Sequence, residues 1–192
     1  PLEYQAQARA FCDEHGLLLH LDGARIFNAA VKSNCDVTEI TRHYDSVSVC
    51  LSKGLGAPVG SLLLGSESFI KRATRLRKMV GGGMRQAGIL AAAGRIALEK
   101  GPLRLLEDHE NAEYLSNGLA KIPELEVNPA STQTNIVYAR CKAGQASQLK
   151  DYLAEQGILI TAGDPIRFVT HQDVSREDVD MLLTAIRQFY PS

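Results

Sequence analysis

Hydrophobic and polar residues alternate along the first half of the chain in the order expected of successive helices and strands. Residues 3–15 form an amphipathic pattern of helical period, and Gly16 directly after them predicts the end of that helix. The apolar run Leu17–Leu21 follows and predicts a buried parallel strand. The remaining pattern predicts helices over 24–30, within 37–44, over 68–79 and over 86–100, and strands over 46–51 and 61–64 that pair as a hairpin.

The pattern changes at Gly101-Pro102, which predicts the end of one helix and the start of another over 102–120. After it, the sequence predicts strands over 125–127, 134–139, 158–161 and 166–170, and helices over 145–156 and 176–189, the last with Ser175 as its N-cap. Strands and helices mixed in this way favour an α+β layer of its own. We therefore predict an α/β chain with two domains, 1–102 and 103–192.

The chain begins with Pro1, and its first predicted helix leads directly into a predicted parallel strand. Parallel strands are joined by such a crossover helix, so another strand precedes the helix in a complete βαβ unit. We therefore expect a fragment, or a processed or truncated chain, that lacks the first strand of this unit.

Composition excludes some classes of partner. Of the 192 residues, 45% are apolar and 22% are charged, and the formal net charge is -1. These values are ordinary for a globular protein and give no general attraction to nucleic acid or to an acidic membrane. We therefore expect neither as a partner. One basic cluster is typical of a solvated helix face and consists of Lys71, Arg72, Arg75, Arg77 and Lys78.

The cysteines indicate a compartment rather than a site. Cys12, Cys35, Cys50 and Cys141 form no C-x-x-C pair and have no metal-ligand spacing, so we predict no metal site. Scattered cysteines without a disulfide pattern indicate a reducing compartment, and we predict the cytoplasm. No apolar run approaches the roughly 20 residues that span a bilayer.

Two side chains that suit one cofactor follow predicted strands. Asp22 comes just past the end of the predicted strand over 17–21, and Lys53 comes just past the strand over 46–51. Ligands of open α/β sheets gather at this edge. A lysine amine forms a Schiff base with pyridoxal phosphate, and a carboxylate keeps the cofactor's ring nitrogen protonated. Taken singly, each motif is typical of a turn or a helix cap, but together they predict a pyridoxal phosphate site.

Neighbouring residues fit this interpretation. Arg25 comes one helical turn after Asp22 and can hold the phenolic oxygen of the cofactor or a substrate carboxylate. Gly54 and Gly56 permit close approach of a flat ligand. His20 lies two residues before Asp22, hence on the same strand face, where it can serve as a supporting residue.

Four motifs carry a resemblance to a known family: residues 20–30 (His-Leu-Asp-Gly-Ala-Arg-Ile-Phe-Asn-Ala-Ala), 52–61 (Ser-Lys-Gly-Leu-Gly-Ala-Pro-Val-Gly-Ser), 78–88 around the triple glycine, and 167–171 (Arg-Phe-Val-Thr-His). Together they resemble the low-specificity threonine aldolases. These belong to the β-eliminating lyase group of the fold type I pyridoxal phosphate enzymes. The resemblance covers nearly the whole chain. It implies the C-terminal portion of the cofactor-binding large domain over 1–102 and a small C-terminal domain over 103–192.

The resemblance also implies residue roles. Lys53 would be the catalytic Schiff-base lysine, and Asp22 would pair with the pyridine nitrogen. Arg25 would contact the phenolic oxygen or the substrate, and Arg167 would bind the substrate α-carboxylate. The implied reaction is retro-aldol cleavage of L-threonine or L-allo-threonine to glycine and acetaldehyde.

Oligomeric assembly is implied as well. In the family the stretch that contains Lys78 and Arg85 lies near the cofactor phosphate and reaches it from a neighbouring subunit, although a solvated helix end explains Lys78 equally well. The resemblance thus implies a homodimer or homotetramer with shared sites. The family's N-terminal glycine-rich phosphate loop, its stacking histidine and its candidates for the general base are not in this sequence. We therefore expect weak or absent cofactor binding and no useful aldolase activity if these residues act alone.

Two alternatives remain open from the sequence. Asp22, Lys53 and Arg167 would serve another fold type I lyase or an aminotransferase equally well. A non-catalytic interaction fragment, the remnant of such an enzyme, is the alternative from a different class.

Overall fold

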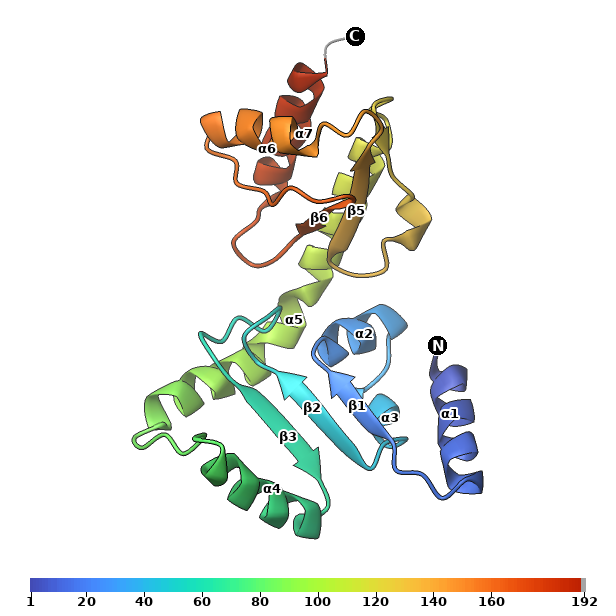
Figure 1. Ribbon diagram of the computed structural model, residues 1–192, viewed down its shortest axis with the longest axis vertical. Helices are drawn as coiled ribbons and strands as arrows, with labels where there is room; N and C mark the ends of the chain where they lie inside the picture. Colours follow the sequence, from blue (N-terminus) through green and yellow to red (C-terminus); the bar gives the residue numbers. More distant parts are fainter. Residues whose placement is uncertain (191–192) are drawn as a thin grey trace. The chain divides into compact units, whose positions relative to one another are not determined.

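The computed structural model describes residues 1–190, and the chain divides into two compact units, one from Pro1 to Leu105 and one that begins at Leu106. The elements of the first unit up to α5 are α1 (Leu2–Glu14), β1 (His20–Gly23), α2 (Ile26–Ser33), α3 (Val37–Thr41), β2 (Ser46–Cys50), β3 (Ser61–Gly65) and α4 (Glu67–Met79) (Figure 1). Helix α5 (Gly88–Leu119) crosses the division between the units.

The first unit is built on a three-stranded sheet of order β1-β2-β3. β1 pairs with β2 in parallel, with Asp22 opposite Ser48, and β3 returns antiparallel to β2. The predicted hairpin is therefore confirmed. Val47 and Val49 on one sheet face pack against Ile26 and Ile40 of α2 and α3, so these helices cover that face.

The opposite sheet face is polar. Because side chains alternate along a strand, this face carries His20 and Asp22 of β1 together with Ser46, Ser48 and Cys50 of β2. This face contains the carboxylate predicted to bind the cofactor, and its residues are exposed or half-buried.

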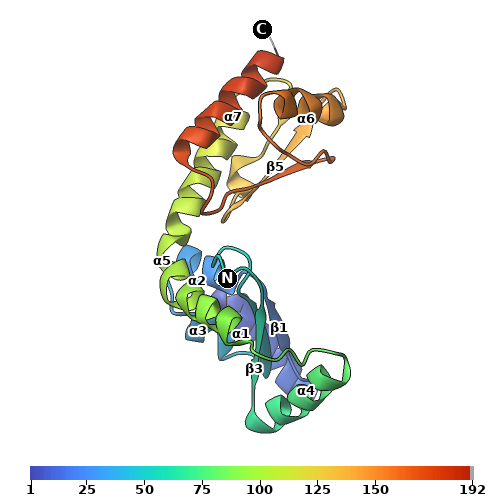
Figure 2. The same cartoon turned by 90° about the vertical axis from the view of Figure 1, so that its left-hand side faces the viewer.

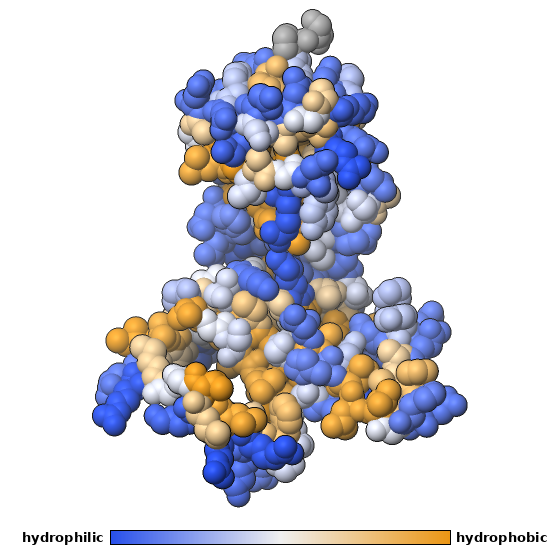
Figure 3. All heavy atoms as spheres, viewed as in Figure 1, coloured by the Kyte–Doolittle hydropathy of each residue, from blue (hydrophilic) through white to orange (hydrophobic). Residues whose placement is uncertain are grey.

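Apolar side chains are exposed on the edge strand β3 and on the helix α4 that follows it. Leu62, Leu63 and Leu64 of β3 are exposed, and α4 buries none of its residues although its apolar residues share one side. Figure 3 shows apolar surface on this unit. An amphipathic helix of this kind stabilises a fold through its apolar side only when that side is covered.

The second unit contains an antiparallel sheet of order β4-β5-β6. Its elements after α5 are β4 (Leu125–Glu126), a 3-10 turn (Pro129–Ser131), β5 (Ile136–Cys141), α6 (Ala146–Glu155), β6 (Ile166–Val169) and α7 (Arg176–Phe189). The core of this unit joins the buried sides of β5 and β6 to α6, α7 and the end of α5 (Figure 2). Ser175 caps α7 as predicted, since its hydroxyl accepts a hydrogen bond from the Asp178 amide at 3.1 Å.

Three predicted elements are wrong. Leu17 and Leu18 are not a buried strand, because pairing with β2 begins only at His20 and the side chain of Leu18 is 86% exposed. Residues 158–161 are irregular and belong to neither sheet. The third error concerns Pro102.

Pro102 lies inside the continuous helix α5 and does not begin a new one. A proline in a helix removes one backbone hydrogen bond and costs about 3 kcal/mol. Burial on both sides of the proline offsets this cost, because Ala97 and Leu105 pack into one cluster with Leu55. Gly101 permits that packing, since a Cβ on it would lie 2.9 Å from Leu55 Cα.

Candidate active site

Asp22 lies on the exposed polar face at the end of β1 that leads into α2. One carboxylate oxygen accepts a hydrogen bond from the Ala24 amide at 3.1 Å, which fixes the turn after the strand. The second oxygen has no hydrogen-bond or ion-pair partner among residues 1–190, so it is available to a ligand. Gly23 is required here by packing, because a Cβ would lie 2.6 Å from the Ser48 carbonyl oxygen.

Lys53 lies in a turn that backbone hydrogen bonds hold firmly. The Leu51 amide donates to the Gly60 carbonyl at 2.9 Å and closes the turn at its ends, and the Gly56 amide donates to the Lys53 carbonyl at 2.9 Å. Gly56 has φ +80°, a left-handed conformation that favours glycine. The apolar side chains of the turn are buried against α5. Lys53 itself is exposed, and in the described part of the chain its ammonium group has no ion-pair partner.

The segments that follow β1 and β2 meet in space. Arg25 and Asn28 line a void of about 10 Å³ together with Cys50, Gly54 and Leu55. Arg25 immediately precedes α2, is half-buried, and forms no ion pair within the described range. The structure thus brings the segment that follows Asp22 and contains Arg25 against the turn that carries Lys53, at one edge of the parallel pair β1–β2.

The polar face beside this edge holds one residue that the sequence suggested and one that it missed. His20 Nδ1 lies 2.8 Å from the Ser46 hydroxyl, so the ring predicted as a supporting residue is held by β2. Cys50 lies on the same face, 3.5 Å from the Ser52 hydroxyl, and was not predicted as a neighbour of the site. The alternation of Ser46, Ser48 and Cys50 was the signal in the sequence that could have revealed this polar row.

The environment of Cys50 shifts its acidity. Burial raises the pKa of its thiol, but hydrogen bonds from Ser52 and Ser61 and the charge of Lys53 outweigh burial, so the pKa lies below its usual value. The positive charge of Lys53, the candidate cofactor lysine, thus helps to lower the pKa of the Cys50 thiol.

Lys78 and Arg85 lie in α4 and in the turn that follows it. Lys78 is near the end of α4, and a Cβ on Gly83 would lie 2.7 Å from its Nζ, so the ammonium group covers the glycine backbone. Arg85 is exposed in the turn that follows. Within residues 1–105, no described hydrogen bond, ion pair or void joins either side chain to Asp22, Arg25 or Lys53.

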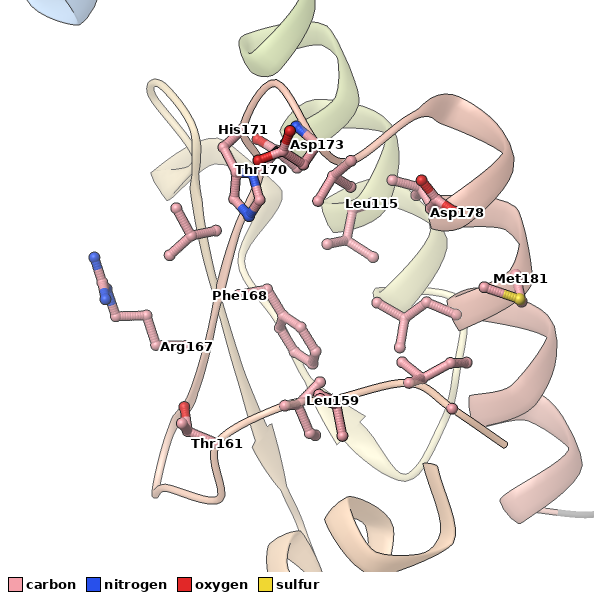
Figure 4. Close-up of a pocket in the computed structure, with 17 residues that line it drawn as sticks. Leu115, Leu159, Thr161, Arg167, Phe168, Thr170, His171, Asp173, Asp178 and Met181 are labelled. Atoms are coloured by element: carbon pink, nitrogen blue, oxygen red, sulfur yellow. Dashed lines mark hydrogen bonds and ion pairs between the residues drawn. The ribbon is translucent and has the colours of Figure 1, made fainter. Parts of the chain in front are cut away.

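Arg167 lies in β6 of the second unit, and its guanidinium group has no hydrogen-bond or ion-pair partner among the described residues. In Figure 4 its side chain points away from the cavity behind β6, whereas Phe168 points into it. This cavity of about 590 Å³ is lined mainly by apolar residues of β6, α7 and the segment 157–161. Arg167 is one of the lining residues, but its guanidinium group is directed away from the cavity.

A buried hydrogen-bond network anchors the strand that carries Arg167. The Thr170 hydroxyl donates to the backbone carbonyl of Asp108 at 2.6 Å, and the Asn135 amide group donates to the Thr170 carbonyl at 2.9 Å. Thr170 and Asn135 are both buried. Because buried polar groups hold their partners firmly, the end of β6 is fixed against α5 and the segment before β5.

Neither a cluster of metal ligands nor a helix that could span a membrane is found among residues 1–190. The described residues contain no group of three His, Cys, Asp or Glu side chains arranged to hold a metal ion. Among residues 1–190, no helix has the length and apolar character that crossing a membrane requires.

The architecture matches solved structures. A structure from Exiguobacterium sp. 255-15, assigned as an aromatic amino acid beta-eliminating lyase/threonine aldolase, superposes with a TM-score of 0.82 at 21% identity and covers 96% of this chain and 56% of its own. A structure from Listeria monocytogenes EGD-E, assigned as an L-allo-threonine aldolase, gives 0.81 at 22% identity, with 97% and 56% covered. The fold is therefore the α/β fold of the fold type I class, as predicted.

Sequence comparison identifies the family. The beta-eliminating lyase family model matches residues 1–142. The low specificity L-threonine aldolase of Escherichia coli K12 is 48% identical over 98% of this chain and 56% of its own length. The corresponding enzyme of Saccharomyces cerevisiae is 35% identical, with 99% and 49% covered. The chain belongs to the beta-eliminating lyase family, and it spans about half the length of the curated relatives it matches.

Proposed function

We propose that the chain is the part of a pyridoxal phosphate-dependent aldolase that carries its lysine, and that the enzyme cleaves L-threonine and L-allo-threonine to glycine and acetaldehyde. The observation that carries this proposal is the placement of Asp22 and Lys53 at the same edge of the parallel strands β1 and β2. The similarity to curated low specificity L-threonine aldolases supports the choice of substrate.

The residues at this edge fit the cofactor. Asp22 has one carboxylate oxygen without a partner in the described structure, and this oxygen can hold the proton on the ring nitrogen. Lys53 has an exposed amine that can bind the cofactor's aldehyde. Arg25 supplies a cation for the phenolic oxygen or a substrate carboxylate. Bound pyridoxal phosphate supplies the electron sink for the charge left at Cα when a bond to Cα breaks.

The other residues act on the substrate and on the phosphate. Arg167 has a planar donor pair that matches a carboxylate, so we assign it the substrate α-carboxylate. Lys78 and Arg85 provide positive charge that suits a phosphate group. In the reaction, the β-hydroxyl loses its proton, the Cα–Cβ bond breaks with release of acetaldehyde, and Cα takes up a proton to give glycine.

The assembly that we propose is a homodimer or homotetramer. The exposed leucines of β3 and the uncovered apolar side of α4 support association with further protein. A cytoplasmic location is supported by the four cysteines, all of which are free thiols.

Product analysis of the purified whole enzyme that contains this chain tests the reaction. With threonine and pyridoxal phosphate, we expect equimolar glycine and acetaldehyde, and we expect Lys53→Ala to abolish both products. Lys32→Ala, on the adjacent helix α2, is the matched control and keeps both. Formation of a keto acid instead would favour an aminotransferase. Absence of any product would favour the non-catalytic alternative.

A further inference from the structure

Tyr138 and Arg167 lie directly opposite each other on β5 and β6. Directly opposite residues of an antiparallel pair share one face of the sheet, with Cβ atoms about 4.5–5.5 Å apart. Their neighbours along the two strands, Val137, Ala139 and Phe168, are buried on the other face. Tyr138 and Arg167 therefore both project from the outer face, and the Tyr138 side chain is 51% exposed.

The charges on this face are unequally paired. Arg140, the next outward residue of β5, is bound by Asp164 at 2.7 Å and lies 3.8 Å from Glu126. Arg167 has no such partner in the described part of the chain. An anion that reaches this face thus finds an available cation at Arg167, because Arg140 is already paired with acidic side chains.

Tyr138 lies opposite this cation, where its ring can limit the freedom of the arginine side chain. An exposed arginine has many side-chain conformations, and binding a planar carboxylate requires one orientation of its guanidinium group. A large ring on the directly opposing residue can occupy space toward β5 and so reduce the number of conformations that point there. Tyr114 shows the contrasting case: its hydroxyl donates to Asp180 at 2.6 Å, and Arg176 lies 4.0 Å from its ring centroid. Tyr138 and Arg167 make no such contact with each other, so both stay available to a ligand.

We infer that Tyr138 is a positioning residue for Arg167, and that its ring sets the affinity of this face for the carboxylate of an α-amino acid. The inference rests on the proposed function, in which Arg167 receives the substrate α-carboxylate. Because the carboxylate does not react, Tyr138 contributes to the ground state and the transition state equally. Its loss therefore raises KM and leaves kcat unchanged.

Steady-state kinetics with threonine and calorimetric titration with glycine test the inference on the purified whole enzyme that contains this chain, with pyridoxal phosphate. For Tyr138→Ala we expect KM and the glycine dissociation constant to rise about fivefold. Without the ring, the Arg167 side chain has more conformations, and ordering it on binding costs more free energy. Tyr138→Phe keeps the ring and restores both constants to nearly their original values. Tyr4→Ala, which removes an exposed tyrosine on α1, is the control, with both constants unchanged.

Three results with the variants would overturn the inference. Tyr138→Ala could leave both constants unchanged, or Tyr138→Phe could be as impaired as Tyr138→Ala, which would assign the effect to the hydroxyl. A fall in kcat and thermal midpoint without a rise in KM would show a purely structural role. If glycine binding weakens in Tyr138→Ala but the unaltered protein releases no acetaldehyde from threonine, the proposed reaction fails while the inference stands. No glycine binding by the unaltered protein defeats the inference directly.

Discussion

Gly54 and Leu105 pack so closely that a Cβ on residue 54 would lie 2.9 Å from Cδ2 of Leu105. Leu105 is 1% exposed and belongs to the cluster that buries the turn around Lys53. Gly54, the residue directly after the candidate lysine, is thus packed against α5. This packing fixes the backbone position from which the Lys53 side chain extends.

Gly54→Ala tests this relationship. The added methyl group has to displace Leu105 or the turn, and overpacking of this kind costs about 1–3 kcal/mol of unfolding free energy. We expect a lower denaturant midpoint and weaker retention of pyridoxal phosphate during dialysis. Gly88→Ala is the matched control, because no atom lies within 4 Å of a Cβ there. Equal behaviour of the two variants would argue against the contact.

Asp22→Asn removes the charge that we assign to the cofactor's ring nitrogen and keeps the side-chain shape. Electrostatic groups of this kind contribute a hundredfold or more to rate, so we expect kcat to fall by about two orders of magnitude. Asp13→Asn, which affects only a surface ion pair with Arg9, is the control. A kcat within a few-fold of the unaltered protein for Asp22→Asn would refute the assigned role.

Cys50 provides a pH prediction near the site. Its thiol pKa lies below the usual value, because the hydrogen bonds from Ser52 and Ser61 and the charge of Lys53 outweigh burial, so its thiolate forms at lower pH than that of an ordinary cysteine. We expect iodoacetamide to alkylate Cys50 before the buried Cys12 and Cys141, as mapped by peptide mass spectrometry. Ser52→Ala should shift the pH midpoint of alkylation upward. A midpoint that stays the same in this variant would show that Ser52 does not lower the pKa of the thiol.

Asp45 links stability to pH in the first unit. The Leu19 amide donates to its carboxylate at 2.7 Å and Arg9 at 2.8 Å, and these contacts lower its pKa. A lowered folded-state pKa means that the stabilisation is complete above the unfolded-state pKa and disappears as pH falls through the folded-state value. We expect Asp45→Asn to flatten the loss of thermal midpoint between neutral and acid pH. An unchanged slope would show that Asp45 does not contribute.

The sequence predicted the local part of this structure and missed what depends on distant residues. Ser175 caps α7 as expected because a cap is set within four residues. Gly101-Pro102 does not end a helix, because Leu55 and Leu105, far apart in sequence, hold α5 together across the proline. Leu18 belongs to an apolar run typical of a buried strand, but its side chain is exposed. Burial depends on a pairing partner that the sequence pattern alone does not reveal.

The candidate site divides in the same way. Asp22 and Lys53 stay predictions as site residues, but their placement near one edge followed from the strand pattern, because Asp22 lies in β1 near its end and Lys53 follows β2. Tyr138 was not predictable, because its relation to Arg167 depends on the register of β5 and β6. The alternation of side chains along β2 places Cys50 on the polar face. Its pKa was not predictable, because it depends on the turn that brings Ser52 and Lys53 close to the thiol.

Chemical labelling of the lysine tests the central claim most directly. Borohydride reduction of the purified protein with bound pyridoxal phosphate fixes the cofactor to the amine that holds it, and peptide mass spectrometry locates the phosphopyridoxyl group. We predict the group on Lys53 and its loss in Lys53→Ala, with Lys32 and Lys78 unlabelled. A phosphopyridoxyl group on another lysine, or on none, would contradict the role assigned to Lys53.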